Sequence, residues 1–531
     1  MHRYRAPARR LSPLLALAAL ACDPWGRLDP SGSTGVDQPL WDEQLTVVGD
    51  SLYVPLPYAG ALLNISAEGD VREVDLDGAR PERIIGLPAG DAAYVFVRWP
   101  VCEDDSKDIV YEDDCPPELL EEATEVRQVE GQRTVELVDI APHFNSIGFS
   151  PDGRNAVAYF SGNLGSAEIQ GVVDLTEVVF QPLDGGAPIA VSTGSTPTDV
   201  LFTTDADGIN DRAVILSSSQ VMVVSLSTGE VQVTYHLALD VDSVIVPQDA
   251  MVAGGGRYAL LSVAGARELY RLDLVNKSID IEDLQDSPST LTEVRLPEAA
   301  GGALASAISY SNVGAVDLLD GLTNERLEAY TLDHPVNVVF QSGDLLIAYN
   351  SAIDAYKDVY LIDLATNEVD EHRANNPLSS VQITVDQGFL VGLMRPESSS
   401  TGEGTYADGL PGLYVLDLNT RREANLALGS SPVGYELVER DGQSFVLLLL
   451  EDDETLYKVD LTRPSFAEPV ELPAPARDIA ARADGRIAIS HNSALGLISI
   501  YDPATGDIET IHGFANVGLL STPTLPRRAD D

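Results

Sequence analysis

The sequence predicts an all-β protein: a single β-propeller built from four-stranded blades. Two observations lead to this fold class. An alternating apolar strand that ends in Val/Leu-Asp-Leu and runs into a polar turn recurs along the chain, and helical periodicity is nearly absent. The recurrence is about 44 residues, which is the length of four strands of five to six residues with their turns.

Ten copies of this strand-and-turn phrase can be counted. The clear copies are at residues 71–75, 135–139, 269–273, 359–363, 413–417 and 456–460, and the looser ones at 178–186, 221–229, 313–318 and 498–506. One equivalent position in each gives 75, 139, 182, 225, 273, 317, 363, 417, 460 and 502. Two looser copies also fit inserted hairpins, so the sequence allows seven to ten blades, with ten units counted.

A second phrase, an Asp-Gly turn before an apolar strand, occurs at residues 149–154, 440–443 and 483–486. Glycine supplies the positive φ of a tight hairpin turn, and we expect the following strand to be an inner strand. Together the two phrases resemble the YVTN and WD40-like propellers of bacterial envelope proteins. The resemblance spans roughly residues 45–515 and implies the fold rather than an activity. Residues 45–57 and 514–520 are candidates for closing the ring.

The N-terminus predicts export. Residues 1–21 combine basic arginines with an apolar run too short for the ~20 residues that cross a bilayer, as a signal peptide does. Ala19-Leu20-Ala21-Cys22 resembles the lipobox of bacterial lipoproteins, which implies a lipidated Cys22 and a lipid-anchored protein of the bacterial cell envelope, on the periplasmic or outer-surface side. The same residues fit an ordinary A-x-A cleavage site, so plain secretion is the alternative.

The remaining chain divides into a tether, a propeller and a tail. Residues 22–43 form the tether after the lipidated cysteine, 44–520 the propeller and 521–531 the C-terminal tail. The propeller carries an acidic insert at about 100–130 and a Gly/Ser-rich loop insert at about 395–412. The best helical candidate, 117–124, lies in the first insert.

Cys102 and Cys115 lie close together in the acidic insert, and Cys22 is the third cysteine. A disulfide between Cys102 and Cys115 would stabilise the fold by roughly 3 kcal/mol in an oxidising compartment. A pair of free thiols is the alternative.

The charge of the chain restricts its partners. With 83 acidic and 33 basic residues the net charge is −50, which excludes nucleic acid and direct binding to anionic lipid. Membrane contact is therefore expected only through the lipid anchor. The charge suits a cationic partner, divalent ions or solubility outside the cytoplasm.

One motif predicts a calcium site. Asp205, Asp207 and Asp211 surround Gly208 in a pattern that resembles the D-x-D-G-x-x-D loops of integrin-type propeller blades. The resemblance implies calcium ligands from these three side chains and from the carbonyl of Ile209. Thr203 stands where the full pattern has a first carboxylate. A solvated acidic turn is the alternative.

No catalytic residue is assigned. The seven histidines are scattered, and the sequence contains no H-E-x-x-H pair, G-x-S-x-G elbow or phosphate-binding glycine loop. We therefore expect a non-enzymatic binding or scaffold protein that holds a protein or small ligand at a propeller face. The alternative is a lactonase-like hydrolase or lyase with its site at the central channel mouth, where His143 and His491 are candidates to point.

Overall fold

The described part of the chain forms ten four-stranded blades. In the computed structural model these residues contain forty β-strands and no α-helix, and each blade consists of four consecutive strands paired antiparallel. The fold class is therefore a β-propeller, as the sequence predicts, and the ten blades match the ten counted repeats. The structure describes residues 46–512 except 50, 57–60, 68, 75, 77–78, 88–91, 103–119, 132, 139–143, 145, 162–174, 184–185, 205–209, 239–244, 299–300, 353–355, 397–409, 441, 451–452 and 492–496.

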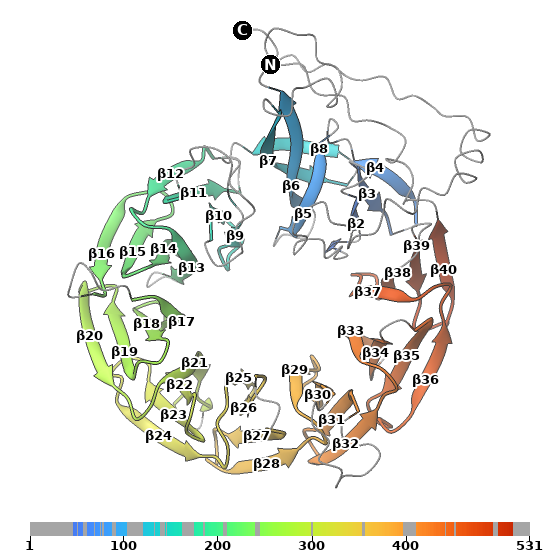
Figure 1. The fold of residues 1–531 in the computed structure, drawn as a ribbon. Coiled ribbons are helices and arrows are strands. Elements are labelled where there is room, and N and C mark those ends of the chain that lie inside the picture. Colours follow the sequence, from blue (N-terminus) through green and yellow to red (C-terminus); the bar gives the residue numbers. More distant parts are fainter. Residues whose placement is uncertain are drawn as a thin grey trace. The chain divides into compact units, whose positions relative to one another are not determined.

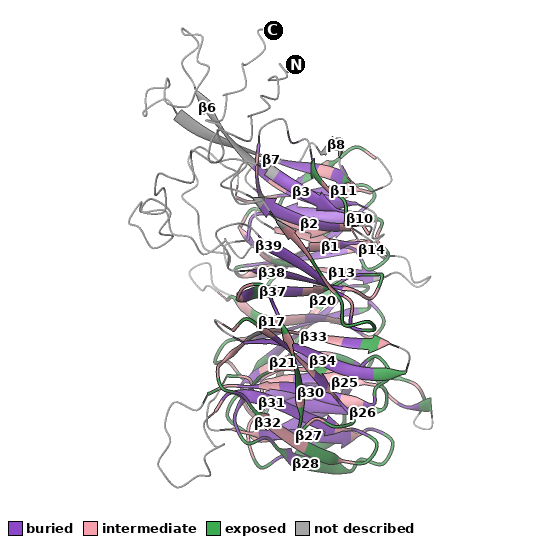
Figure 2. Ribbon diagram, turned by 90° about the vertical axis from the view of Figure 1, so that its right-hand side faces the viewer, coloured by how far each residue is buried: buried purple, intermediate pink, exposed green. Residues whose placement is uncertain are grey.

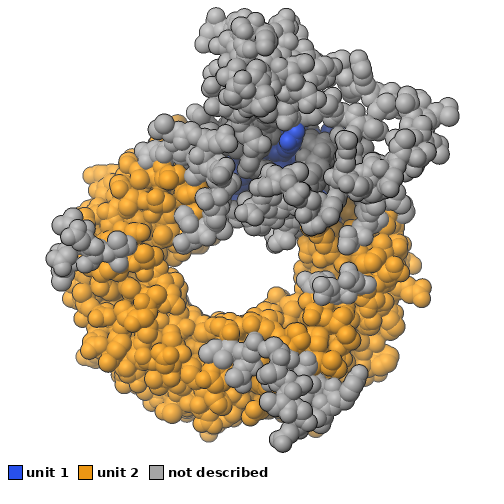
Figure 3. Space-filling view, viewed as in Figure 1, with its two compact units in different colours: residues 1–142, 166–171, 513–531 blue, residues 143–165, 172–512 orange. Residues whose placement is uncertain are grey.

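The chain divides into two compact units (Figure 3), and we number the blades in chain order. Unit 1 comprises residues 1–142, 166–171 and 513–531 and contains blades 1 and 2. Blade 1 has β1 (Thr46–Val48), β2 (Ser51–Leu56), β3 (Ala61–Ile65) and β4 (Val71–Val74). Blade 2 has β5 (Arg80–Gly86), β6 (Ala93–Cys102), β7 (Leu120–Glu130) and β8 (Arg133–Val138).

Unit 2 comprises residues 143–165 and 172–512 and contains blades 3 to 10, which follow one another along an arc with the first strand of each blade on the inner side (Figure 1). Blades 3 to 6 are β9 (Ser146–Phe149), β10 (Asn155–Tyr159), β11 (Glu177–Pro182), β12 (Ile189–Ser192); β13 (Pro197–Thr204), β14 (Asn210–Ser217), β15 (Gln220–Ser225), β16 (Val231–His236); β17 (Pro247–Ala253), β18 (Tyr258–Val263), β19 (Glu268–Asp273), β20 (Ser278–Asp283); and β21 (Pro288–Arg295), β22 (Leu304–Tyr310), β23 (Ala315–Asp320), β24 (Arg326–Thr331). Blades 7 to 10 are β25 (Val338–Ser342), β26 (Leu345–Tyr349), β27 (Asp358–Asp363), β28 (Val369–Arg373); β29 (Leu378–Ile383), β30 (Phe389–Met394), β31 (Gly412–Asp417), β32 (Arg422–Ala427); β33 (Pro432–Arg440), β34 (Gln443–Leu450), β35 (Thr455–Asp460), β36 (Ala467–Glu471); and β37 (Ala476–Ala481), β38 (Ile487–His491), β39 (Leu497–Tyr501), β40 (Ile508–His512).

The hydrophobic core of unit 2 lies between neighbouring blades. The second and third strands are apolar on both faces, so β18 and β27 are buried along almost their whole length. Outer strands such as β28 are mostly exposed (Figure 2). Each apolar cluster joins two successive blades: one contains Val316 of β23 and Tyr360 of β27, for example. Burial of apolar area thus fixes each blade against the next.

The recurring Val/Leu-Asp-Leu phrase marks the turn after the third strand. In blade 5 the side chain of Asp273 accepts the amide N–H groups of Val275 and Asn276, and its carbonyl accepts that of Lys277. Lys277 has a φ of 57°. The same bonds recur at Asp320, Asp363 and Asp417. An aspartate that caps the next backbone amides explains why this residue type recurs there.

The structure corrects three assignments of the sequence phrases to strands or turns. In blades 1 and 2 the phrase falls on the fourth strand, β4 or β8, instead of the third. In blade 6 the turn aspartate is Asp320, not the residue at 317, which lies within β23. Finally, the strand after each Asp-Gly turn is the second strand of its blade and not the inner one.

Two other expectations are resolved by the strand pairing. Residues 120–124, the end of the helical candidate, belong to β7, which pairs with β6 so that Cys102 faces Leu120. The helical interpretation is therefore wrong for those residues, because the segment continues a long hairpin. The second expectation is that residues 45–57 and 514–520 close the ring. Residues 45–57 contribute β1 and β2, which among the described residues pair only within blade 1. Residues 514–520 lie outside the described residues.

Candidate functional site

The inner strands of unit 2 share a feature that the sequence search missed. In most of them a β-bulge follows the first residue, and a polar residue stands just after it: Asp199, Asp249, Thr290, Ser380 and Asp478. Proline begins β13, β17, β21 and β33. A proline two positions before a polar residue, as in β13, β17 and β21, is the signal that could have identified these three strands.

Asp249 of β17 shows how these inner polar groups are used. One of its carboxylate oxygens accepts the amide of Ala250 at 2.9 Å, and the other accepts the amide of Leu291 in the next blade at 2.7 Å. Burial raises the pKa of Asp249 above its usual range, and the nearby carboxylate of Asp199 adds to the rise. Asp249 therefore joins two blades rather than offering an unused carboxylate.

A second row of inner side chains also connects blades. Glu293 accepts the amide of Gly255 in the preceding blade, and Gln341 of β25 accepts the amide of Arg295 at 2.8 Å. Glu439 of β33 accepts the amides of Val385 and Asp386. These acidic and amide groups satisfy backbone donors of the neighbouring blade, which is a structural role.

His491 lies at the end of β38 and is buried. Its Nδ1 is 2.8 Å from the carbonyl oxygen of Ala474, and its Nε2 is 2.8 Å from the hydroxyl of Ser499. Burial lowers the pKa of His491 below its ordinary value, so the neutral ring is favoured. Both ring nitrogens are thus used, one by the segment before β37 and one by β39. His143, the other candidate, lies outside the described residues.

Two further histidines contact carboxylates in or between blades. The Nδ1 atom of His334 lies 2.7 Å from the carboxylate of the buried Asp358. The Nδ1 atom of His372 on β28 lies 2.7 Å from the carboxylate of Glu423 on β32 of the next blade. These pairs were not apparent from the sequence, because about fifty positions separate the second pair.

The predicted calcium ligands are only partly described. Asp205 and Asp207 lie outside the described residues, in the loop that joins β13 to β14. Asp211, on β14, is 3.1 Å from the guanidinium of Arg212. Thr203, which replaces a carboxylate of the motif, is buried and donates to the carbonyl of Gly256 at 2.7 Å. Within the described ranges, no group of three or more His, Cys, Asp or Glu side chains is arranged to hold a metal ion.

The cysteines are largely beyond what the structure describes. Cys22 and Cys115 are outside the described residues, and for Cys102 only its backbone position at the end of β6 is described. The Cys102–Cys115 disulfide and the lipidation of Cys22 therefore remain predictions. In the described part of the chain no helix has the length and apolarity needed to cross a membrane.

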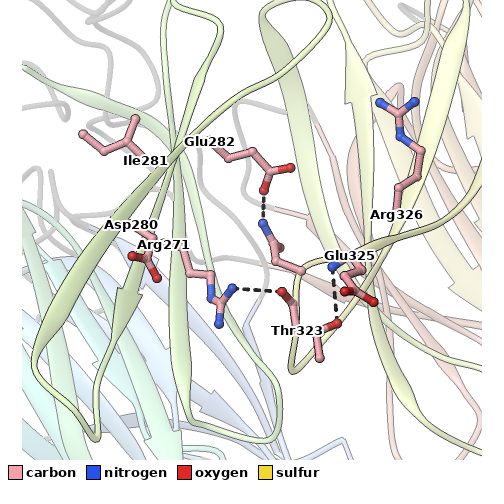
Figure 4. Close-up of a pocket in the computed structure, with 8 residues that line it drawn as sticks. Arg271, Asp280, Ile281, Glu282, Thr323, Glu325 and Arg326 are labelled. Carbon is pink, nitrogen blue, oxygen red and sulfur yellow. Dashed lines mark hydrogen bonds between the residues drawn. The ribbon is translucent and has the colours of Figure 1, made fainter.

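A cavity opens on the outer side of blades 5 and 6. It has a volume of about 450 Å³ and lies between β20 and the turn that joins β23 to β24 (Figure 4). Its lining residues are Arg271, Asp280, Ile281, Glu282, Thr323, Asn324, Glu325 and Arg326. Two neighbouring blades thus build one concave surface from segments that are about forty residues apart.

The two guanidinium groups of this cavity already have partners. Arg271 donates to the carbonyl oxygens of Thr323 and Leu322, each at 3.2 Å, and lies 4.1 Å from the centre of the Tyr258 ring. Arg326 is 2.8 Å from a carboxylate oxygen of Asp317. These arginines hold the two blades together and compensate a buried charge.

The carboxylates of the cavity are less constrained. Glu282 accepts a hydrogen bond from the side-chain amide of Asn324, and Figure 4 shows no second bond from Glu282 to the residues drawn. Burial raises the pKa of Glu282 above its usual range. The carboxylates of Asp280 and Glu325 have no hydrogen-bond or ion-pair partner among the described residues. The cavity therefore offers acceptors that internal donors do not occupy.

Comparisons with known proteins find only distant structural likenesses. No family model matches the sequence, and no curated protein matches it. Among solved structures, it is similar to Kuenenia stuttgartiensis hydrazine synthase (15% identity, TM-score 0.33, 59% of this chain and 95% of that chain). It is also similar to the Dos1 propeller (12%, 0.42, 69% and 91%) and the Neurospora crassa Pan2 WD40 domain (9%, 0.31, 56% and 87%). Likenesses this distant support no inference about function.

Proposed function

We propose that the protein is a non-enzymatic binding or scaffold propeller and that the cavity between blades 5 and 6 holds part of its partner. One observation carries this proposal. The inner carboxylates Asp249, Glu293 and Glu439 accept backbone amides of neighbouring blades, whereas Asp280 and Glu325 in the cavity have no such partner. Concave surfaces with convergent polar groups are the usual location of ligand sites.

The competing proposal is a lactonase-like hydrolase or lyase. Such an enzyme would use carboxylates or histidines at the channel mouth to hold a cation or to move a proton. On the inner strands of unit 2, the amide bonds to Asp249 and Glu439 leave these carboxylates engaged. This observation favours the binding function.

Site-specific crosslinking tests the position of the partner site. A photo-crosslinking amino acid placed at Ile281, which lines the cavity and is 53% exposed, should give partner adducts in cells. The matched control is Val369 on β28, an outer strand of blade 7, which is 37% exposed. Adducts at Ile281 several times more abundant than at Val369 are expected. Equal labelling at both positions would show that the cavity is not the binding site.

We also propose that Cys22 carries a lipid anchor that places the propeller at the bacterial cell envelope. The support is the sequence: a basic and apolar leader followed by Ala19-Leu20-Ala21-Cys22. Labelled fatty acid should enter the wild-type protein, and Cys22→Ser should lose both the label and the membrane association. Equal labelling of the two proteins would favour plain secretion.

Calcium at the β13–β14 loop is a further proposal, supported by the pattern of Asp205, Asp207 and Asp211. The loop closes a hairpin whose last pair is Thr204 and Asn210. Asp211 would have to leave Arg212 to act as a ligand. A site of ~10 μM affinity would add roughly 2.7 kcal/mol at 1 mM calcium. Asp207→Ala should abolish this gain, and magnesium should not reproduce it; identical responses to both ions in both proteins would leave only an acidic turn.

A further inference from the structure

We propose that the cavity between blades 5 and 6 receives an arginine or lysine side chain from a partner protein, in a segment where apolar residues flank the basic one. This inference rests on the proposed binding function and names the chemistry of the ligand. It follows from the local charge, from a buried carboxylate behind the cavity wall and from the apolar residues at its rim.

The charge of the cavity favours a cation. Asp280, Glu282 and Glu325 contribute three carboxylates, against the two guanidinium groups of Arg271 and Arg326. Each guanidinium already contacts an internal acceptor: Arg271 donates to two backbone carbonyls, and Arg326 lies beside Asp317. An incoming cation meets carboxylates with unused acceptor capacity, and charge-assisted hydrogen bonds are the strong ones.

A buried carboxylate, Asp317, lies behind the wall of the cavity. The side chain of Asp317 on β23 is fully buried, and one of its oxygens, Oδ2, is shared by the hydroxyl of Tyr310 and the guanidinium of Arg326. Its other oxygen, Oδ1, has no hydrogen-bond partner among the described residues. Arg326 is half-exposed and compensates this buried carboxylate in part. Burial is the main cause of the raised pKa of Glu282; Asp317 adds to the rise, while Arg271 and Arg326 oppose it.

The exposed apolar residues at the rim of the cavity favour a protein segment over a metal ion or a simple polyamine as the ligand. Ile281 and Leu322 are 53% and 54% exposed, and Leu327 next to Arg326 is 44% exposed. Ile281 lines the cavity, and Leu322 and Leu327 adjoin the lining residues Thr323 and Arg326 in the chain. Exposed apolar side chains grouped around a polar pocket are typical of protein interaction sites.

Synthetic peptides test the ligand class on the full chain. The probes are an acetylated and amidated Gly-Leu-Arg-Leu-Gly peptide, the same peptide with neutral citrulline in place of arginine, and spermidine. Binding is followed by titration calorimetry at low salt. The arginine peptide should bind about tenfold more tightly than the citrulline peptide, since only its guanidinium is charged, and the difference should shrink with added salt.

Charge-matched variants locate the binding. Asp280→Asn/Glu282→Gln/Glu325→Gln should reduce binding of the arginine peptide by about tenfold or more. The control Glu371→Gln/Glu468→Gln/Glu471→Gln changes the net charge equally on the exposed strands β28 and β36 and should leave binding nearly unchanged. Circular dichroism confirms that both variants are folded.

Each alternative outcome overturns the inference in a recognisable way. Equal binding of the arginine and citrulline peptides, or no binding of either, would reject a basic side chain as the ligand. Equal loss in both triple variants would assign the effect to the overall field of the protein. Spermidine binding as tightly as the arginine peptide would replace the protein segment by a small cation. In all these cases, crosslinking at Ile281 would still report separately on the proposed function.

Discussion

Carboxylates at the inner and outer edges of blades 5 and 6 are used differently. At the inner edge, Asp249 accepts two backbone amides, one of them from the next blade, and Glu293 reaches back to the preceding blade. At the outer edge, Asp280 and Glu325 have no partner among the described residues, and Glu282 has one neutral donor. The comparison shows that a carboxylate in this highly acidic protein is structural where a neighbouring blade presents amide donors to it. Where none reaches it, the carboxylate stays available to a ligand.

The largest expected effect is at the inner edge. Asp249→Ala leaves the amides of Ala250 and Leu291 without their acceptor, and we expect a loss of about 2–3 kcal/mol in unfolding free energy. Asp249→Asn keeps one acceptor oxygen and should lose less. Urea denaturation followed by circular dichroism measures both.

The matched substitution at the outer edge is Asp280→Ala. It removes a carboxylate of the same type that bonds to no described residue, so the stability should stay within about 0.5 kcal/mol of wild type. If Asp280→Ala and Asp249→Ala destabilise the protein equally, the distinction between the two edges is wrong.

The buried ring of His491 is expected to have an effect smaller than that of Asp249→Ala. Its pKa is lowered in the folded protein, so below the ordinary value of 6.5 the unfolded chain takes up a proton that the native ring resists. Stability should therefore fall as the pH drops from 6.5 toward the lowered pKa, by at most about 1.4 kcal/mol per pH unit, and the group should have no such effect above 6.5.

The comparison of wild type with His491→Gln isolates this contribution, since the carboxylates are common to both proteins. The stability difference between the two should change between pH 7.5 and 5.5, with wild type losing more on acidification. A difference that is constant over this range would mean that the ring becomes protonated without leaving its contacts to Ala474 and Ser499.

The sequence predicts the features that depend on local geometry. The turn at Asp273 bonds to amides two and three residues later, so its pattern recurs in the sequence and reveals both the fold class and ten blades. The glycines of the Asp-Gly turns, Gly153, Gly442 and Gly485, have the expected positive φ of 67°, 75° and 78°. The assignment failed at 317, because Asp317 and Asp320 are both preceded by apolar strand residues and only the turn contacts tell them apart.

The contacts between blades could not be predicted in the same way. Arg271 reaches Thr323, and Asp249 reaches Leu291, across more than forty residues. The blade length fixes which residues repeat, but it does not fix which side chain of one blade meets which turn of the next. The cavity is formed at such a junction, so neither Glu282 nor Arg326 stood out in the sequence.

A similarly small effect is expected for Glu282 at the outer edge. Burial raises the pKa of Glu282, which means that its charged form is disfavoured in the folded protein. The native state therefore holds a proton more readily than the unfolded chain, and wild type gains stability as the pH falls from the raised pKa toward the ordinary value of about 4.5.

Glu282→Gln keeps an oxygen acceptor for Asn324 and removes the charge. Its stability at neutral pH should equal or slightly exceed that of wild type, within about 0.5 kcal/mol, and the excess should vanish on acidification. Urea denaturation at pH 7 and pH 5 measures this change. A loss above about 1 kcal/mol at pH 7 would make Glu282 a structural residue like Asp249, because a carboxylate kept for a ligand should stabilise the ligand complex and not the free fold.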